Sequence, residues 1–251
     1  MKQTNYDSQF FKDLSHTISE LKKQNITPLA AFDADGTLWS IDIGESFFNF
    51  LIQKKRVELP TNPWEHYLEL KKKNNDPQEA YLWLAQICKN QPIETVRSWS
   101  QEALEQYGPP GDWIYPEQLK LIQFLQSHHI PIYIVSASIT WAIEPGAALF
   151  RVPKENVLAV ETIVEKGLIT DFQNGPITYQ KGKVEKLLLA TQNKHPFLAS
   201  GNTLGDQHLL ESASHYKIAI QGAAPASKMY PAEEKLQHLA QQQGWIRMHF
   251  S

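Results

Sequence analysis

The chain has 251 residues, of which 42% are hydrophobic and 20% are charged, and its formal net charge is −3 at neutral pH. This composition excludes a disordered chain, and apolar runs no longer than a strand exclude a membrane span. The weak negative charge gives no general attraction to nucleic acid. A polar N-terminal segment and a single cysteine, Cys88, favour a cytoplasmic protein without disulfides, and no pattern indicates an oligomeric state.

The first third of the chain predicts a helix, a strand and then several helices. Apolar residues at helical spacing predict a helix over 5–24. The apolar run Leu29–Phe32 predicts a buried strand that ends in the polar turn Asp33-Ala34-Asp35-Gly36-Thr37. Proline and glycine then separate four helical patterns without strand-like alternation, over 44–57, 63–73, 77–89 and 92–107.

The rest of the chain alternates between strands and helices. We expect helices over 116–128, 140–150, 183–191, 226–242 and, briefly, from Leu209. We expect strands over 131–135, 196–200, 216–220 and, at an edge, 245–249, with a hairpin formed by 157–164 and 168–170. This order predicts an α/β fold with a Rossmann-like, doubly wound parallel sheet. The predicted core domain comprises 1–41 and 113–251, and 42–112 form a small all-helical cap inserted after the first strand.

Polar residues follow three of the predicted strands. They lie at Asp33–Thr37, at Ser136-Ala137-Ser138 and at Gly201–Asp206, and Lys181-Gly182-Lys183 opens a helix. Ligands of parallel sheets bind beyond the carboxyl ends of the strands, so these side chains should meet at one edge. Carboxylates, hydroxyls and an ammonium group at one edge suit a metal ion together with a phosphate.

These motifs, in this order, resemble the four motifs of the haloacid dehalogenase superfamily of phosphohydrolases. The resemblance runs from about Leu29 to Ile220 and is closest to the phosphoserine-phosphatase-like branch, whose lysine motif looks like the segment that begins at Lys181. The predicted cap also lies where that branch has its small helical cap. The resemblance implies a Mg²⁺-dependent phosphatase that hydrolyses a small phosphomonoester through an aspartyl-phosphate. Charge and composition predict neither nucleic acid nor a membrane as a partner.

The resemblance also implies a role for each motif residue. Asp33 matches the nucleophile, and Asp35 matches the general acid that protonates the leaving oxygen and then activates water. Mg²⁺ would be held by the carboxylate of Asp33, the backbone carbonyl of Asp35 and an oxygen of Asn202 or Asp206. The residues expected to bind the phosphate are Gly36 and Thr37, through exposed backbone N–H groups, with Ser136, Ala137 and Lys181.

Two features leave alternatives open. The family usually has an aspartate where this chain has Asn202, and an amide oxygen binds Mg²⁺ with less charge. Lys181 is chosen over Lys183 because it matches the family's lysine motif. The alternatives to a phosphatase are a non-catalytic binding protein with a relic site and a phosphotransferase or phosphomutase on the same scaffold.

The composition of the predicted cap bears on the substrate. From Asp42 to Asp112 there are eleven acidic and eight basic residues, with several tryptophans among them. Carboxylates and indoles together suit an ammonium group, as in phosphoserine, phosphoethanolamine or phosphocholine. Asp42, Glu45 and Trp39 follow the catalytic turn closely and are the candidates for that contact. The alternative is that the tryptophans form the interior of the cap and its acids face solvent.

Overall fold

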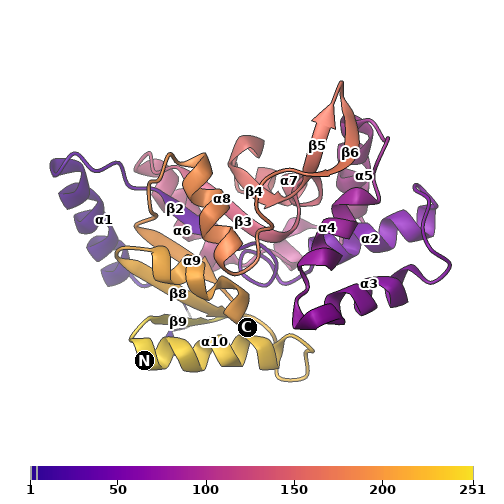
Figure 1. The fold of residues 1–251 in the computed structure, drawn as a ribbon. Coiled ribbons are helices and arrows are strands. Elements are labelled where there is room, and N and C mark those ends of the chain that lie inside the picture. The colour runs from indigo at the N-terminus through magenta and orange to yellow at the C-terminus, as the bar shows by residue number, and fades with distance from the viewer. Residues whose placement is uncertain (1, 4, 251) are drawn as a thin grey trace.

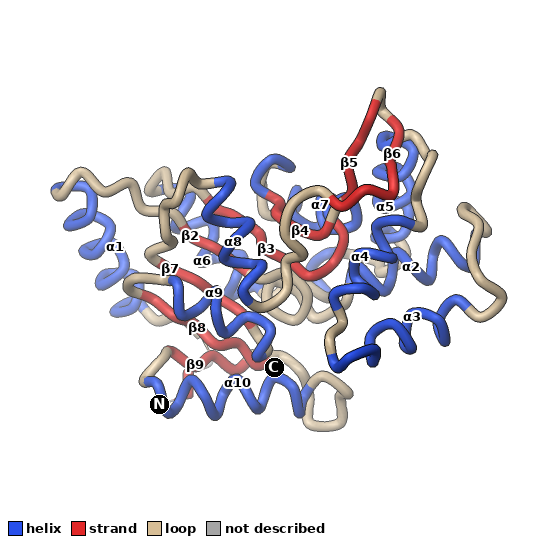
Figure 2. The backbone as a smooth tube through the Cα atoms, in the orientation of Figure 1, coloured by secondary structure: helices blue, strands red, loops and turns tan. Residues whose placement is uncertain are grey.

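The computed structural model describes residues 2–3 and 5–250, which form a large parallel sheet, a small hairpin and helices around them (Figure 1). No helix in this described part combines the length and the apolar character that a bilayer crossing needs. The large sheet has seven parallel strands in the order β1-β9-β8-β7-β2-β3-β4 (Figure 2). Their bounds are Lys2–Gln3, Ile246–His249, Tyr216–Gln221, Leu198–Gly201, Ala30–Phe32, Ile132–Ile139 and Val157–Val160.

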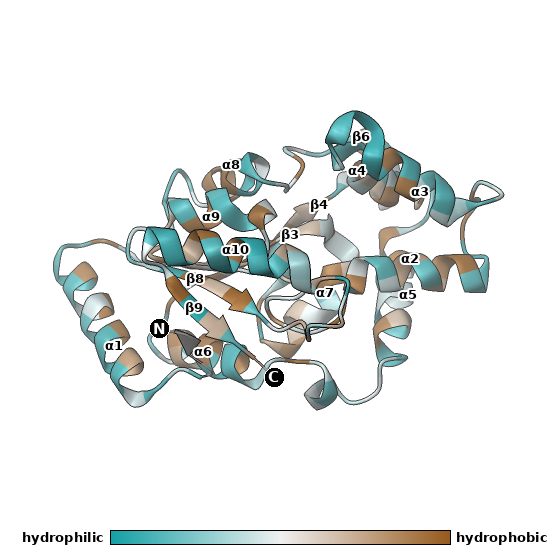
Figure 3. Cartoon of the chain, turned by 90° about the horizontal axis from the view of Figure 1, so that it is seen from below, coloured by the Kyte–Doolittle hydropathy of each residue, from teal (hydrophilic) through white to brown (hydrophobic). Residues whose placement is uncertain are grey.

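Helices cover both faces of this sheet, as the alternation of strand side chains requires. In β2, Ala31 belongs to an apolar cluster formed with α8 (Lys181–Ala190), α9 (Gln207–Ser212) and α10 (Tyr230–Gln243). Its neighbours Ala30 and Phe32 belong to the cluster that includes α1 (Ser8–Lys23), α6 (Pro116–Ser127) and α7 (Thr140–Leu149). Coloured by hydropathy, α10 is hydrophilic along much of its length, with apolar positions toward the strands (Figure 3). The predicted doubly wound α/β class is therefore confirmed.

The segment between β2 and α6 is helical, as predicted. It contains α2 (Ile43–Lys54), α3 (Pro63–Lys72), α4 (Gln78–Gln86) and α5 (Ile93–Glu105), grouped at one side of the sheet in Figure 1. Its interior is aromatic: Phe48 packs edge-on against Trp64 and Trp83, with ring centroids 4.9 and 5.5 Å apart. Two of the tryptophans that suggested an ammonium site therefore contribute to the packing of these helices.

Two predicted strands differ from the structure. The segment 157–164 is two strands, because β4 joins the large sheet while β5 (Thr162–Glu165) pairs antiparallel with β6 (Leu168–Gln173). The hairpin also pairs with the turn between α4 and α5: the N–H of Ile93 donates to the carbonyl of Gly167 at 2.9 Å, and that of Asn90 to Ile169 at 2.8 Å. The segment 245–249 was predicted at an edge, but β9 lies inside the sheet because β1 pairs with its outer side.

The order of the strands places the site. The chain runs from β2 outward to β3 and β4, and then returns through α8 to β7 on the other side of β2. The carboxyl end of β2 is therefore the point at which the strand order reverses, and ligands of open α/β sheets bind at such a point.

Candidate active site

A buried row of three charged groups lies at the carboxyl end of β2. The ammonium group of Lys183 donates to Oδ1 of Asp33 and to Oδ1 of Asp206, both at 2.6 Å. The three residues are 2%, 6% and 1% exposed, respectively. Burial and the nearby Asp206 raise the pKa of Asp33 to about 7, against the opposing effect of Lys183. Burial alone would lower the pKa of Lys183, but the two carboxylates raise it, so this lysine stays charged.

The lysine in this row is Lys183, so the choice of Lys181 as the phosphate-site lysine is corrected. Lys181 is exposed at the first position of α8 and lines a hollow on the outside of the protein with Gln78 and Glu185. Positions two apart in a helix point in nearly opposite directions, so only one of the two lysines can face Asp33. Leu187 is buried one turn beyond Lys183, and this i, i+4 pattern could have identified the inward face of α8.

Asp35 is held by donors on both of its carboxylate oxygens. Trp39 Nε1 and the N–H of Ile43 donate to Oδ1 at 2.7 and 2.9 Å, and Ser138 Oγ donates to Oδ2 at 2.7 Å. Burial raises the pKa of Asp35, although these donors oppose the shift. A fixed carboxyl group with a raised pKa suits a general acid.

These contacts assign structural roles to two residues. Trp39 is 0% exposed, so its indole cannot present a face to a substrate, and the prediction that it contacts substrate is corrected. Its N–H instead orients Asp35. Ser138 lies shortly before α7, which begins at Thr140 without a side-chain cap, and its hydroxyl is a partner of Asp35.

The backbone N–H groups of the turn after β2 form hydrogen bonds within the turn itself. The N–H of Gly36 donates to the carbonyl of Trp39 at 2.9 Å, and the N–H of Thr37 to that of Ala34 at 3.0 Å. Neither N–H is exposed for a phosphate, so that part of the prediction is corrected. The buried hydroxyl of Thr37 donates to Oδ2 of Asp33 at 2.8 Å and so orients the carboxylate from the side opposite Lys183.

Ser136 and Ala137 lie in β3, the strand beside β2. The register of β3 against β4 shifts between Val135 and Ile139, and irregular strands often redirect side chains near active sites. Ser136 is buried, and its Oγ accepts a hydrogen bond from the N–H of Ser138 at 3.1 Å, which leaves its own O–H to donate. Ala137 is half-buried and can contribute only its backbone.

In the loop after β7, the side chains of Asp206 and Asn202 have different hydrogen-bond partners. Oδ1 of Asp206 accepts from Lys183, and Oδ2 accepts from the N–H groups of Asn202 and Thr203 at 3.1 and 3.0 Å. One carboxylate oxygen of Asp206 therefore holds the lysine, and the other shapes the loop. The side chain of Asn202 instead donates from Nδ2 to Oε1 of Glu233 at 3.1 Å.

Glu233 of α10 is a site residue that sequence reasoning missed. It is 1% exposed, and its Oε2 accepts from the N–H groups of Gly222 and Ala223 at 3.0 and 2.9 Å. Burial raises the pKa of Glu233, and the three N–H donors oppose the shift. Its sequence context is an ordinary amphipathic helix, and only the fold brings it against Asn202.

The donor set of this site fits Mg²⁺. Within the described residues there is no cluster of three or more His, Cys, Asp or Glu side chains suited to a metal. Mg²⁺, however, is usually bound by one or two carboxylates, several waters and substrate phosphates. The nitrogen end of Asn202 is committed to Glu233, which leaves its amide oxygen for a cation.

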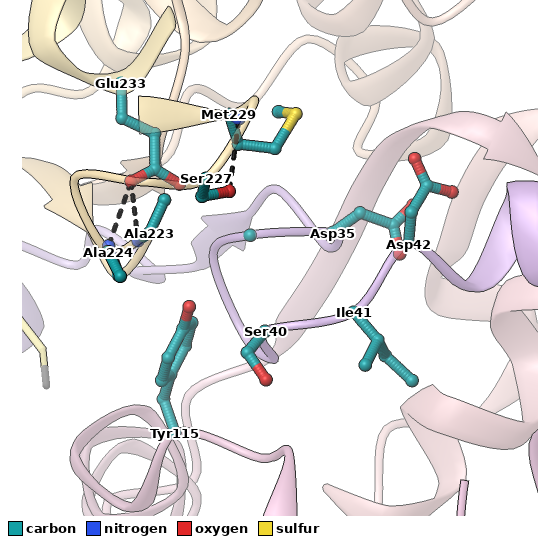
Figure 4. Close-up of a pocket in the computed structure, with 12 residues that line it drawn as sticks. Asp35, Ser40, Ile41, Asp42, Tyr115, Ala223, Ala224, Ser227, Met229 and Glu233 are labelled. Carbon is teal, nitrogen blue, oxygen red and sulfur yellow. Dashed lines mark hydrogen bonds between the residues drawn. The ribbon is translucent and has the colours of Figure 1, made fainter. Parts of the chain in front are cut away.

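A cavity of about 230 Å³ opens beside the turn that follows β2. Figure 4 shows Asp35 and Asp42 on one side of it, Glu233 on another, and Tyr115 facing them from below. The exposed carboxylate of Asp42 caps α2 by accepting from the N–H of Glu45 at 2.7 Å. Glu45 is not a free acid, because it forms an ion pair with Lys71 at 3.1 Å.

Comparisons with known proteins identify a matching family model and solved structures of similar fold. The family model for haloacid dehalogenase-like hydrolases matches residues 30–211, whereas no curated protein matches the chain. A protein of unknown function from Bordetella pertussis Tohama I aligns with a TM-score of 0.68 and 20% identity over 88% of this chain and 97% of its own. A phosphoserine phosphohydrolase-like protein from Francisella tularensis SCHU S4 aligns with a TM-score of 0.55 and 20% identity, over 89% of this chain and 94% of its own. A HAD family hydrolase from Salmonella enterica serovar Typhi aligns with a TM-score of 0.55 and 16% identity, over 91% of this chain and 75% of its own.

Proposed function

The chain belongs to the haloacid dehalogenase-like hydrolases, and we propose that it is a Mg²⁺-dependent phosphatase that acts on a small phosphomonoester through an aspartyl-phosphate. The observation that carries this proposal is the pair of carboxyl groups at the end of β2. Asp33 is oriented by Lys183 and Thr37, and Asp35 is held by three donors. A relic site would have no reason to keep both carboxyl groups buried and oriented.

In the first step, Asp33 attacks the phosphorus while the bond from phosphorus to the leaving oxygen breaks. Asp35 gives its proton to that oxygen, so an alcohol leaves and a phosphoryl group remains on Asp33. Lys183 lies against Oδ1 of Asp33 and offsets the negative charge that the phosphate brings. The hydroxyl of Ser136 would donate to a phosphoryl oxygen.

In the second step, water attacks the phosphorus and the bond to Asp33 breaks. Asp35, now ionised, takes a proton from this water, and phosphate leaves with both carboxyl groups restored. Asp33, the backbone carbonyl of Asp35 and the amide oxygen of Asn202 would hold Mg²⁺, which supplies positive charge against the phosphate oxygens. Asp206 would act through the lysine and the loop rather than as a ligand.

Asp33→Asn tests the reaction with p-nitrophenyl phosphate and Mg²⁺. An amide is too weak a nucleophile to form the phospho-enzyme, so turnover should vanish while circular dichroism shows an unchanged fold. A variant that keeps most of the wild-type rate would remove Asp33 as the nucleophile. A wild-type protein without Mg²⁺-dependent turnover on a panel of phosphomonoesters would support a binding protein instead.

We further propose that the leaving group lies in the cavity beside Asp35 and carries an ammonium group. Three carboxyl groups line the cavity, from Asp35, Asp42 and Glu233, together with the apolar Ile41 and Met229. Only Asp42 among the acids is exposed and keeps an oxygen that accepts no hydrogen bond from the described residues. Asp42 is therefore the residue that we expect to contact the ammonium group, whereas Glu45 is already paired.

Asp42→Asn separates this role from helix capping, because asparagine caps helices as well as aspartate does. Loss of an ammonium contact worth up to about 2 kcal/mol should lower kcat/KM for phosphoethanolamine or phosphocholine by roughly 30-fold. The same variant should leave kcat/KM for p-nitrophenyl phosphate nearly unchanged, and Glu45→Gln serves as the matched control. Equal losses on both substrates, or a wild-type preference for sugar phosphates, would contradict this substrate class.

A further inference from the structure

We propose that Glu233 is a positioning residue that fixes the side-chain amide of Asn202, so that its nitrogen points to α10 and its oxygen is offered to Mg²⁺. This inference rests on the proposed function only in requiring that the site bind Mg²⁺. It accounts for the amide at a position where the family usually has an aspartate.

The contact between the two side chains is direct and buried. Nδ2 of Asn202 lies 3.1 Å from Oε1 of Glu233, and the residues are 2% and 1% exposed. Glu233 is itself fixed, since its other oxygen accepts from the N–H groups of Gly222 and Ala223. A carboxylate with three N–H donors in a buried setting presents only acceptors, so it selects the nitrogen end of the amide.

The catalytic turn blocks the other side of the amide. Gly36 has a φ of +75°, and a Cβ at this residue would lie 2.0 Å from Nδ2 of Asn202 and 3.4 Å from Oε1 of Glu233. The amide is therefore enclosed between the turn that carries the catalytic aspartates and the first turn of α10. The hydrogen bond to Glu233 then determines which end of the amide faces α10.

An amide suits this place better than a carboxylate would. A carboxylate at residue 202 would set two groups of acceptors against each other across a buried gap, with like charges in contact. Asparagine has one donor end for Glu233 and one acceptor end for the cation. At residues 202 and 233, one side chain must therefore donate and the other accept. Either residue can be the donor, but two acceptors or two donors would not pair.

The experiment measures Mg²⁺ dissociation constants by calorimetry without substrate, and thermal unfolding without metal, for wild type, Glu233→Gln, Asn202→Asp and the double variant. Glu233→Gln sets a donor against Nδ2 and should weaken Mg²⁺ binding about 10- to 100-fold, as lost partners of metal ligands do. Asn202→Asp alone should lower the unfolding temperature, because two carboxylates then face each other. The double variant restores a donor–acceptor pair with exchanged roles, so it should unfold later than Asn202→Asp and bind Mg²⁺ more tightly than Glu233→Gln.

Glu234→Gln is the matched control, because it makes the same chemical change at the adjacent, exposed residue of α10. It should leave the Mg²⁺ affinity and the unfolding temperature unchanged. The positioning role would be overturned by a wild-type Mg²⁺ affinity in Glu233→Gln. It would also be overturned by a double variant that neither unfolds later than Asn202→Asp nor binds Mg²⁺ more tightly than Glu233→Gln. Both outcomes would leave the phosphatase proposal intact. A wild-type protein that binds no Mg²⁺ would overturn both, and Mg²⁺ binding with the expected pattern but no phosphatase activity would overturn only the proposed function.

Discussion

The ammonium group of Lys183 separates two buried carboxylates, so its removal should be costly. In Lys183→Met, Asp33 and Asp206 would remain buried without their shared cation, a situation that destabilises proteins by about 3–5 kcal/mol. We expect turnover of p-nitrophenyl phosphate to be lost and the unfolding temperature to fall. The matched variant Lys181→Met should change neither, because that side chain is exposed. Loss of activity in Lys181→Met with a fully active Lys183→Met would return the role to Lys181.

The raised pKa of Asp33 predicts how Mg²⁺ binding depends on pH. Below a pKa of about 7 the metal-free carboxyl group is largely protonated, and a proton there competes with the cation. The Mg²⁺ dissociation constant should therefore fall by about 20-fold between pH 5.5 and 7.5, and level off above that. Calorimetry across this range gives the measurement. An affinity that does not change with pH would mean that the carboxyl group is already ionised at pH 5.5.

The sequence was sufficient to place Asp33 and Asp35 together after a strand, but not to predict the partners that hold them. Asp33 and Asp35 follow a recognisable strand, and local chain geometry keeps them together. The partners Lys183, Ser138 and Glu233 come from three other elements, and their contacts depend on which face each element presents. A motif match could not distinguish Lys181 from Lys183, because two lysines in one motif differ only in helical phase.

At the scale of elements, the first turn of α2 packs closely on the end of β3. A Cβ on Gly44 would lie 2.4 Å from Oγ of Ser138, the hydroxyl that donates to Asp35. Gly44→Ala should therefore destabilise the protein by about 1–3 kcal/mol, the usual range for overpacking, and should also lower kcat by displacing Ser138. Thermal unfolding and phosphatase kinetics give the two measurements.

Gly111→Ala is the control, because a Cβ there would meet nothing within 4 Å and its φ is not positive. It should be neutral in both assays. A drop in stability without a change in kcat for Gly44→Ala would show that Ser138 does not need to stay in place.

Elements with strong periodicity were predicted well, and those set by tertiary pairing were not. Helices α1 to α6 and the central strands follow apolar patterns that any packing would preserve. The break between β4 and β5 follows no such pattern, because the fully buried β4 is continued by a strand whose Ile163 and Val164 are exposed. The position of β9 depends on pairing with β1, at the opposite end of the chain.

At the scale of the molecule, one apolar cluster runs through the helical segment and the sheet. It joins Phe47 and Val96 of that segment to Leu14 of α1 and Ile134 of β3. A continuous core predicts a single cooperative unfolding transition rather than separate unfolding of residues 42–112. The predicted cap, residues 42–112, would then unfold together with the core, although the two parts could still have different functions.

Cys88 provides the measurement, because it is fully buried within the helical segment and burial raises the pKa of its thiol to about 12. We expect the urea concentration at which half of Cys88 is labelled by a thiol reagent to equal the midpoint of unfolding followed by circular dichroism. Labelling at clearly lower urea concentrations would show that the helical segment opens on its own.

The hairpin β5–β6 restricts how the helical segment can move. The two connections of that segment to the sheet are bonded to each other, from the N–H of Ser40 to the carbonyl of Trp113 at 2.8 Å and from Tyr115 to Leu38 at 3.0 Å. If these paired connections were its sole attachment, the helical segment could rotate about them as about a hinge. The main-chain hydrogen bonds between the hairpin and the α4–α5 turn attach the segment at a second place. Rotation of the helical segment about that line would then require the hairpin bonds to break. If substrate entry needs this rotation, the rate of opening rather than the chemistry would limit turnover.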